Sequence, residues 1–282
     1  MNIEFTKLQG LGNDFIVIDN RIYNFSTQKL STFASRLCTR KLSIGADGLM
    51  AVDTATTSNA DFKMRFYNSD GSIGEMCGNG ARCIARYAFV NNITSNNMSF
   101  ETTAGIVHAQ IQEGRLVKVQ LNNPDILDLD RTVTIDDNIY NCSYIELGNP
   151  GVPHAVVKMT GLNNTATNEI FDLGKALRYD NVFPKGANIN FYDIVDDTTA
   201  IVKTYERGVE DFTLACGTGS ASVAIALILK NILKSNNVKI IVPGGELFVN
   251  IERNKLDVQK VYLIGNTNIV CKGVITDEEL LY

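Results

Sequence analysis

Two short motifs in this chain each place a cysteine directly before glycines and an apolar stretch. The first is Met76-Cys77-Gly78-Asn79-Gly80 and the second is Ala215-Cys216-Gly217-Thr218-Gly219. The apolar stretches predict helices, so each cysteine is expected at a helix N-terminus. Unpaired N–H groups and aligned peptide dipoles at that position lower the pKa of a thiol and bind anions. Each motif therefore predicts a reactive sulfur beside a site for a carboxylate.

A pair of such thiols is suited to inverting a carbon centre. If one carboxylate lay between two helix starts, one sulfur would face each side of the adjacent carbon. One thiolate would remove the α-proton, and the opposite thiol would return a proton to the other face. N–H donors at the carboxylate would stabilise the developing charge by roughly 3 to 4 kcal/mol each. The predicted chemistry is that of a two-base racemase, which requires no cofactor.

The two motifs belong to a longer series of features that repeats along the chain. Cys77 and Cys216 are 139 residues apart, and other groups recur at a similar offset: Leu11-Gly12-Asn13 with Leu147-Gly148-Asn149, and Gly45-Ala46-Asp47 with Gly186-Ala187-Asn188. An ordered series at a near-constant offset indicates an internal duplication. Two domains are therefore predicted: residues 1–118 with 265–282, which carry Cys77, and residues 119–264, which carry Cys216.

The elements that must position these motifs are many short strands and few helices. Hydrophobic periodicity predicts helices over 27–40, 81–90, 172–179 and 220–233. It predicts strands over 3–7, 15–19, 62–67, 106–112, 116–121, 144–147, 154–159, 188–194, 200–205, 238–242, 247–251 and 261–264. The helix after Cys216 is apolar almost all round, as a helix enclosed by a sheet must be.

These patterns indicate an α/β fold, more narrowly α+β. We expect two pseudo-symmetric domains, each a curved, mainly antiparallel sheet or barrel around a central helix, with the site in the interdomain cleft. The 282 residues, 45% of them hydrophobic, supply enough apolar material for two cores.

Composition narrows the class of partner. A net charge of −5 and a pI near 5.2 argue against nucleic acid, so a small molecule is expected. The first ten residues have no basic start or long apolar core, and the longest apolar run, residues 223–229, is too short to span a bilayer. No membrane partner and a cytoplasmic location are predicted. Two histidines without a set of partner ligands predict that there is no metal site.

Several other residues with chemical potential are interpreted more plainly. Cys38, Cys83, Cys142 and Cys271 are expected to be buried small hydrophobes, the usual state of a cysteine outside a reactive site. The arginines of the first motif's helix, Arg82 and Arg86, are expected to be solvated or interdomain. His154 follows a proline and opens an apolar strand. It is equally compatible with a backbone-bonded structural role and with an accessory role in the site.

Four stretches of the chain resemble the diaminopimelate epimerase family, in order and over essentially the whole length. They are GLGNDFIVIDN, FYNSDGSIGEMCGNGARC, FPKGANINF and YERGVEDFTLACGTGSA. The resemblance implies an isomerase that needs no cofactor and converts LL-diaminopimelate to the meso form, on the route to lysine and peptidoglycan. It also implies that the tail from Gly265 onward returns to the first domain, and that a homodimer is plausible.

The resemblance also implies roles for matching residues. Cys216 would be the proton acceptor and Cys77 the donor in one direction, while Gly78, Asn79, Gly217 and Thr218 would offer backbone groups to the reacting carboxylate. The residues matching those that hold the rest of the substrate are Asn13, Asn68, Asn188, Glu206 and Arg207. Arginine can bind a carboxylate through two parallel hydrogen bonds, and a glutamate can offset an ammonium group.

The chain departs from the family pattern in three places. Gly48 stands where many members have glutamine, and Phe212 replaces an acidic or small polar residue. The usual Gly-Asn-Pro-His is expanded to residues 148–154, so either Asn149 reaches the substrate from a longer loop or Val152 occupies the asparagine position and the contact is lost. All three departures concern the distal half of the substrate.

Two alternatives to this function stay open from the sequence. A related racemase with the same two thiols could act on another amino acid, such as histidine or a lanthionine-like compound. A protein of a different class could bind a ligand without turning it over and use the thiols as a reversible disulfide. The second alternative predicts no solvent exchange at any substrate carbon.

Overall fold

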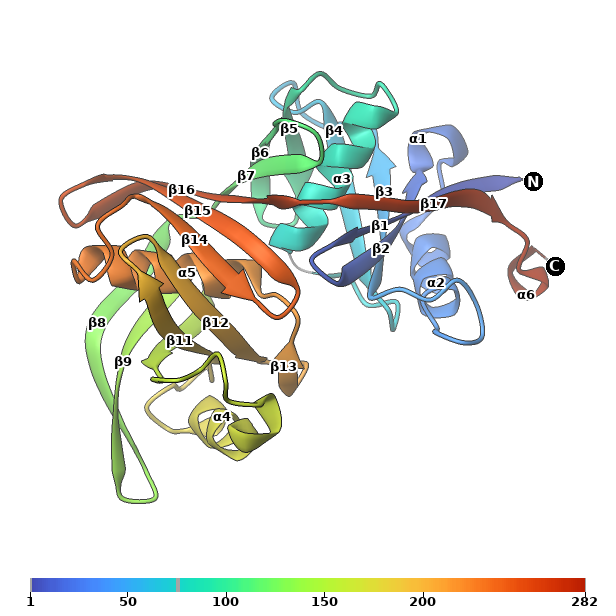
Figure 1. Cartoon of the computed structure of the whole chain (residues 1–282). Coiled ribbons are helices and arrows are strands. Elements are labelled where there is room, and N and C mark those ends of the chain that lie inside the picture. The colour runs from blue at the N-terminus through green and yellow to red at the C-terminus, as the bar shows by residue number, and fades with distance from the viewer. Residues whose placement is uncertain (1, 75–76, 282) are drawn as a thin grey trace. The chain divides into compact units, whose positions relative to one another are not determined.

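The computed structural model describes residues 2–74 and 77–281, shown in Figure 1. Met76, the first residue of the first motif, lies outside the described residues, as do Met1 and Tyr282 at the ends of the predicted first domain. The chain divides into two compact units. Unit 1 comprises residues 1–119 and 265–282, and unit 2 comprises residues 120–264.

Unit 1 is a sheet with helices against it. Its strands are β1 (Ile3–Gly10), β2 (Asn13–Asp19), β3 (Gly48–Asp53), β4 (Phe62–Asn68), β5 (Asn97–Thr102), β6 (Gly105–Ile111), β7 (Leu116–Leu121) and β17 (Asn268–Ile275). Its helices are α1 (Asn20–Tyr23), α2 (Thr27–Leu37), α3 (Gly78–Val90) and α6 (Glu278–Leu281). Strand β1 pairs antiparallel with both β2 and β17, so the returning tail belongs to this sheet.

Unit 2 is built in the same manner. Its strands are β8 (Pro124–Ile135), β9 (Asn138–Leu147), β10 (Val152–Lys158), β11 (Asn188–Asp196), β12 (Thr199–Glu206), β13 (Asp211–Thr213), β14 (Asn237–Val242), β15 (Gly245–Asn254) and β16 (Asp257–Asn266). Its helices are the short η1 (Thr167–Glu169), α4 (Phe171–Tyr179) and α5 (Gly217–Leu229).

The strand order confirms the duplication inferred from the motifs. In unit 1, β1 and β2 are antiparallel, β2 and β3 parallel, β3 and β4 antiparallel, and the chain returns through α3 to β5, parallel to β4. In unit 2, strands β9, β10, β11, β12 and β14 repeat this order, with α5 as the crossover helix. The α/β class and the repeated domains are thus as predicted.

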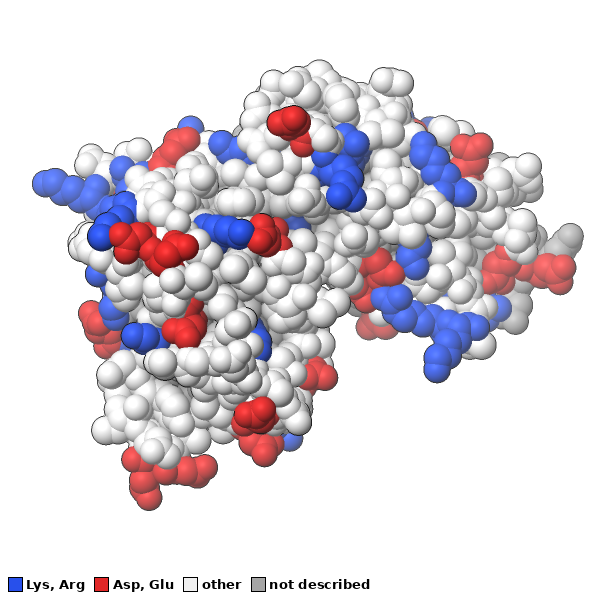
Figure 2. Space-filling view, viewed as in Figure 1, with Lys and Arg blue, Asp and Glu red and all other residues white. Residues whose placement is uncertain are grey.

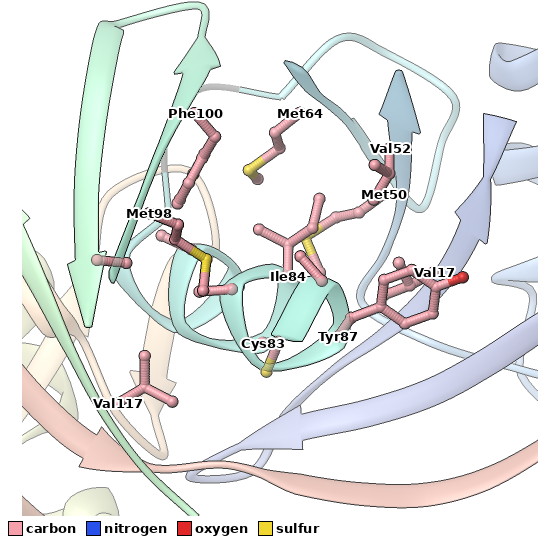
Figure 3. Packing of buried hydrophobic residues seen from close by; sticks show 14 of the residues in the cluster. Val17, Met50, Val52, Met64, Cys83, Ile84, Tyr87, Met98, Phe100 and Val117 are labelled. Carbon is pink, nitrogen blue, oxygen red and sulfur yellow. The ribbon is translucent and has the colours of Figure 1, made fainter. Parts of the chain in front are cut away.

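Each crossover helix is enclosed by the core of its own unit. Figure 3 shows α3 surrounded by side chains of the sheet, among them Val17 from β2, Met50 from β3 and Phe100 from β5. Helix α5 is buried at every position except Thr218. A helix that is apolar on all sides can be stable in this way only, because every face must be removed from water.

Two further helices cover the sheets from outside. In unit 1, α2 packs Leu30, Phe33 and Leu37 against a second core that includes Ile16 and Ile18 of β2. In unit 2, α4 contributes Leu177 to the cluster around Phe191 of β11 and Tyr205 of β12. Strands β2 and β11 are therefore buried over consecutive residues and show no alternation of buried and exposed positions. Such a pattern is typical of strands covered on both faces.

The helix boundaries differ from the predicted ones in a consistent way. Helices α3 and α5 begin at Gly78 and Gly217, three residues before the apolar periodicity starts. Helix α5 ends at Leu229 rather than residue 233, and Asn231 with φ 55° lies in the left-handed region that terminates helices. Helix α2 ends at Leu37 because its terminal carbonyl accepts a hydrogen bond from Gly45 N.

Five strands were not predicted: β3, β5, β8, β13 and β17. Strand β3 is buried without alternation, so a period of two does not reveal it. Strand β8 is mostly exposed and rich in aspartate, which lowers its apparent strand character. Pairing with β9, over nine residue pairs, stabilises it nonetheless.

The structure corrects two of the plainer interpretations. Cys38, Cys83 and Cys142 are buried as expected, but Cys271 is exposed on β17. Arg82 is 0% exposed, so the expectation that it is solvated is wrong. Figure 2 shows basic and acidic side chains interspersed on the viewed face. No helix in the described ranges combines the length and apolarity needed to cross a membrane.

Candidate active site

In unit 1, Cys77 is the N-cap residue of α3 and has extended backbone angles, φ −113° and ψ 122°. Its thiol is half-buried and donates a hydrogen bond to Asn13 Oδ1 at 3.5 Å. Gly78 and Asn79, which supply the first backbone N–H groups of the helix, are buried. The first turn of α3 therefore presents N–H donors beside a sulfur, the arrangement expected for a carboxylate site.

The side chain of Asn13 is oriented by Asp47. Asn13 Nδ2 donates to Asp47 Oδ2 at 2.6 Å, and the same oxygen accepts from Asp14 N at 3.0 Å. Because the amide nitrogen faces Asp47, the amide oxygen faces Cys77. Asp47 is held in turn by Arg40, whose guanidinium donates to its other oxygen at 2.9 Å. A chain of charged groups thus fixes the acceptor that Cys77 meets.

Asn68 and Gly48 are neighbours across the β3–β4 pairing of unit 1. Asn68 is exposed at the start of a turn, where its Nδ2 donates to Ser72 Oγ at 2.9 Å. A β-carbon at Gly48 would lie 2.5 Å from Cε2 of Phe66 and 2.6 Å from the backbone oxygen of Tyr67. The space that a glutamine would need in this chain is filled by Phe66, which explains the departure at position 48.

In unit 2, Cys216 is the N-cap residue of α5, with φ −106° and ψ 112°. Its sulfur accepts a hydrogen bond from Gly219 N at 3.4 Å and lies 3.7 Å from Thr218 Oγ1. The two cysteines therefore occupy equivalent positions but have different hydrogen-bond partners. The sulfur of Cys216 accepts from the helix, whereas the thiol of Cys77 donates to an amide oxygen.

Asn188 and Arg207 are joined by a direct hydrogen bond. Arg207 N donates to Asn188 Oδ1 at 2.8 Å, and Asn188 Nδ2 donates to the backbone oxygen of Pro153 at 3.1 Å. Arg207 is half-buried, and its guanidinium donates once to the oxygen of Lys185 at 3.1 Å. Next to it, burial raises the pKa of the Glu206 carboxyl. A neighbouring cation would stabilise the ionised form of this carboxyl.

His154 follows Pro153 on β10 and is completely buried. Its Nδ1 lies 3.3 Å from Asn190 Nδ2, and its Nε2 has no hydrogen-bond partner among the described residues. Burial, together with the positive charge of Arg207, lowers the pKa of His154 to about 3. The imidazole is therefore neutral at physiological pH, and the contact to Asn190 shows that it is part of the interior of unit 2.

This pKa predicts a dependence of stability on pH. Below pH 6.5 an unfolded His154 binds a proton that the folded protein excludes until about pH 3, so the free energy of unfolding falls as the pH is lowered through that window. Each pH unit removes about 1.4 kcal/mol on account of this group. We expect His154→Gln to reduce the slope of the unfolding free energy against pH, between pH 6 and 4, by about 1.4 kcal/mol per pH unit. Urea unfolding at each pH measures this slope. Parallel curves for the variant and the wild type would contradict a neutral buried histidine.

The other two departures from the family pattern are Phe212 and the expanded segment 148–154, and each has its own structural setting. Phe212 packs edge-on against Tyr205, with ring centroids 5.6 Å apart, so an aromatic cluster occupies the position of the polar residue. Val152 opens β10 and pairs with Leu147, whereas Asn149 is exposed in the preceding turn. Of the two residues, only Asn149 presents an amide to solvent.

Three residues that contribute to these sites were not identified from the sequence: Asp47, Asn190 and Arg82. The recurrence of Gly45-Ala46-Asp47 as Gly186-Ala187-Asn188 was the available signal for Asp47, because both side chains accept a backbone N–H beside the site. Asn190 lies two residues beyond Asn188, so the two side chains are on the same face of β11. The described residues contain no cluster of three His, Cys, Asp or Glu side chains arranged to hold a metal ion.

Comparison with known sequences gives a full-length match. The model of the family described as diaminopimelate epimerase matches the chain twice, over residues 5–127 and 147–270. A diaminopimelate epimerase of Aquifex aeolicus is 40% identical over 288 aligned residues, covering 99% of this chain and 100% of the relative. One from Flavobacterium psychrophilum is 38% identical over 270 residues, covering 95% and 98%.

Solved structures with the same fold are more distant in sequence. A hydroxyproline epimerase from Agrobacterium vitis has a TM-score of 0.71 at 15% identity and covers 97% of this chain and 91% of its own. A phenazine biosynthesis protein of the PhzF family from Bacillus anthracis also has a TM-score of 0.71, at 13% identity, with 98% and 99% covered. At such identities the likeness concerns the fold alone.

Proposed function

Since the chain belongs to the diaminopimelate epimerase family, we propose that it interconverts LL- and meso-diaminopimelate without a cofactor, using Cys77 and Cys216 as the proton-transferring groups. The observation that carries the proposal is structural. Each of two units with the same strand order places one cysteine as the N-cap of an enclosed helix. The relatives carry the description of this activity, and none of them favours histidine or a lanthionine-like substrate, or a redox role.

The reacting carboxylate would be held by the starts of the two helices. Gly78 and Asn79 in unit 1, and Gly217 and Thr218 in unit 2, form the first turns of α3 and α5, where backbone N–H groups point out of the helix end. They are donors that are fixed before the substrate arrives. Negative charge that develops on the carboxylate oxygens when the α-proton leaves is stabilised by such preorganised donors.

The different hydrogen-bond partners of the two sulfurs suggest their roles in one direction. The sulfur of Cys216, which accepts from Gly219 N, is suited to the thiolate. It takes the α-proton, so the Cα–H bond breaks and an S–H bond forms. The thiol of Cys77, oriented by Asn13, gives its proton to the opposite face. After turnover the protonation states of the two sulfurs are exchanged, and exchange with water or the reverse reaction restores them.

The distal amino-acid group would be held by side chains of both units. Arg207 has guanidinium N–H groups for a carboxylate, and Glu206, whose pKa is raised by burial, would be stabilised by an ammonium group. Asn13, Asn68 and Asn188 are assigned to the remaining polar contacts.

The location proposed is the cytoplasm, and the assembly proposed is a homodimer. The reaction proposed lies on the route to lysine and peptidoglycan.

Proton NMR in D2O tests the proposal. With LL-diaminopimelate, the α-proton signal of the inverting centre should disappear as the meso isomer forms. Because one sulfur removes the proton and the other delivers a deuteron, early meso product should carry deuterium while unreacted LL substrate keeps its hydrogen. Absence of exchange with folded protein would reject diaminopimelate as the substrate. Deuterium in recovered LL substrate at the earliest times would instead reject two separate proton carriers.

A further inference from the structure

Arg82 is a fully buried cation under the first turn of α3. Its side chain runs back toward the helix N-terminus, as helical side chains do. One terminal nitrogen donates to Asn79 Oδ1 at 2.9 Å and the other to the backbone oxygen of Gly78 at 3.4 Å. A β-carbon at Gly10 would lie 3.4 Å from the guanidinium, so β1 closes the site from the other side. The charge is thus held within one turn of Cys77.

No carboxylate among the described residues forms an ion pair with Arg82, and its Nε has no hydrogen-bond partner there. Burial lowers the pKa of the guanidinium, while Cys83 and Cys77 act in the opposite direction. Burial also raises the pKa of the Cys83 thiol to about 12, so Cys83 is neutral at physiological pH. Among the described residues, the charge of Arg82 is thus left without an ion-pair partner.

Helix α5 has no equivalent charge. The residue that follows Cys216 at the same interval is Ala221, which is also completely buried. The two helix starts have the same backbone and the same cysteine, but only one has a cation beneath it. A buried, uncompensated charge is destabilising, so its presence in one repeat indicates that it acts on a ligand.

We infer that Arg82 is a positioning residue for the reaction: its guanidinium is the buried counter-charge for the carboxylate at the start of α3, and its hydrogen bond fixes Asn79 in that turn. The inference rests on the proposed function for the identity of that carboxylate. Asn79 Oδ1 is occupied by the guanidinium, so the turn presents its N–H groups with little freedom to rearrange. The positive charge adds to the helix dipole, which favours an anion at the same place.

Alkylation of Cys77 tests this without diaminopimelate. Iodoacetate carries a carboxylate next to the reacting carbon, whereas iodoacetamide is neutral. The full-length chain is treated with each reagent, and the rate at the Cys77 peptide is followed by mass spectrometry, with the exposed Cys271 as internal reference. The iodoacetate-to-iodoacetamide ratio at Cys77 should exceed that at Cys271. In Arg82→Gln it should fall about tenfold.

Two further variants complete the test. Arg82→Lys keeps the charge and should keep the ratio within about threefold of the wild type. Arg86→Gln changes the half-buried arginine on the same helix and should leave it within about twofold. An unchanged ratio in Arg82→Gln, or equal slowing by both reagents, would overturn the inference. If that variant does not fold, equal ratios at Cys77 and Cys271 in the wild type would do so. Because no substrate is used, the result is independent of whether diaminopimelate is epimerised.

Discussion

Replacing either Cys77 or Cys216 by alanine is expected to lower the rate of epimerisation by about 10²- to 10⁴-fold, the range that a positioned acid or base contributes. Each direction of the reaction needs one sulfur as base and the other as acid, so neither variant has a complete pair. Neither sulfur can take over the other's role, because a single group reaches one face of the α-carbon. The measurement is kcat/KM with LL-diaminopimelate and, separately, with the meso isomer.

The fold should survive both changes. Cys77 makes no side-chain hydrogen bond to the N–H groups of its helix, so alanine there costs no cap. Cys216 does cap α5 through Gly219 N, and its loss should cost at most about 1 kcal/mol of unfolding free energy. The matched control is Cys271→Ala, a change at an exposed position on β17, which should keep wild-type activity. Wild-type turnover in either of the first two variants would reject the two-base mechanism.

Gly219→Ala is expected to be more damaging than the equivalent change in the first motif, Gly80→Ala. A β-carbon there would lie 2.2 Å from Asn190 Oδ1 and 3.2 Å from the sulfur of Cys216. The asparagine cannot easily move, because its oxygen accepts from Thr204 Oγ1 and its nitrogen donates to the backbone oxygen of Ala155. We expect a loss of about 1 to 3 kcal/mol in the free energy of unfolding from overpacking. Activity should fall with it, since the clash displaces Cys216.

Gly80→Ala is the matched control, because Gly80 and Gly219 are the third residues of α3 and α5. The atoms nearest to a β-carbon at Gly80 would be Met50 Sδ at 3.4 Å, Phe15 Cζ at 3.5 Å and Cys77 Cβ at 3.7 Å. Alanine is favoured over glycine in a helix by about 1 kcal/mol, so stability should be unchanged or slightly higher. Equal losses for both variants, in urea unfolding, would show that the clash with Asn190 does not decide the outcome.

A double variant locates the cause of the expected loss. Combining Gly219→Ala with Asn190→Ala removes the oxygen that the new methyl group would meet, although it leaves the partners of Asn190 unsatisfied. If the two residues are in conflict, the loss in the double variant should be smaller than the sum of the single losses. Additive losses would instead assign the damage to the backbone of α5 or to the contact with Cys216.

The sequence by itself determined the features that depend on residues close to one another in the chain. Glycines after each cysteine and the apolar runs beyond them predicted two helix starts, and the repeated order of motifs predicted two similar domains. Both hold, because helix periodicity and turn chemistry depend on residues within a few positions of one another. The errors have two causes: β3 is buried without alternation, so a period of two does not reveal it, and β8 is mostly exposed and rich in aspartate.

Only the tertiary structure decided how the two equivalent sites differ. Arg82 was expected to be solvated or interdomain, yet it is completely buried, between β1 and the first turn of α3. The ring of Phe66 leaves no room for a side chain at position 48. The side chain of Asn190 leaves less room for a β-carbon at position 219 than there is at position 80. The hydrogen bond of the Cys77 thiol likewise depends on Asn13, which lies 64 residues away in the chain. Such properties arise from contacts between atoms that the fold brings together from segments far apart in the chain, and a local pattern does not encode those contacts.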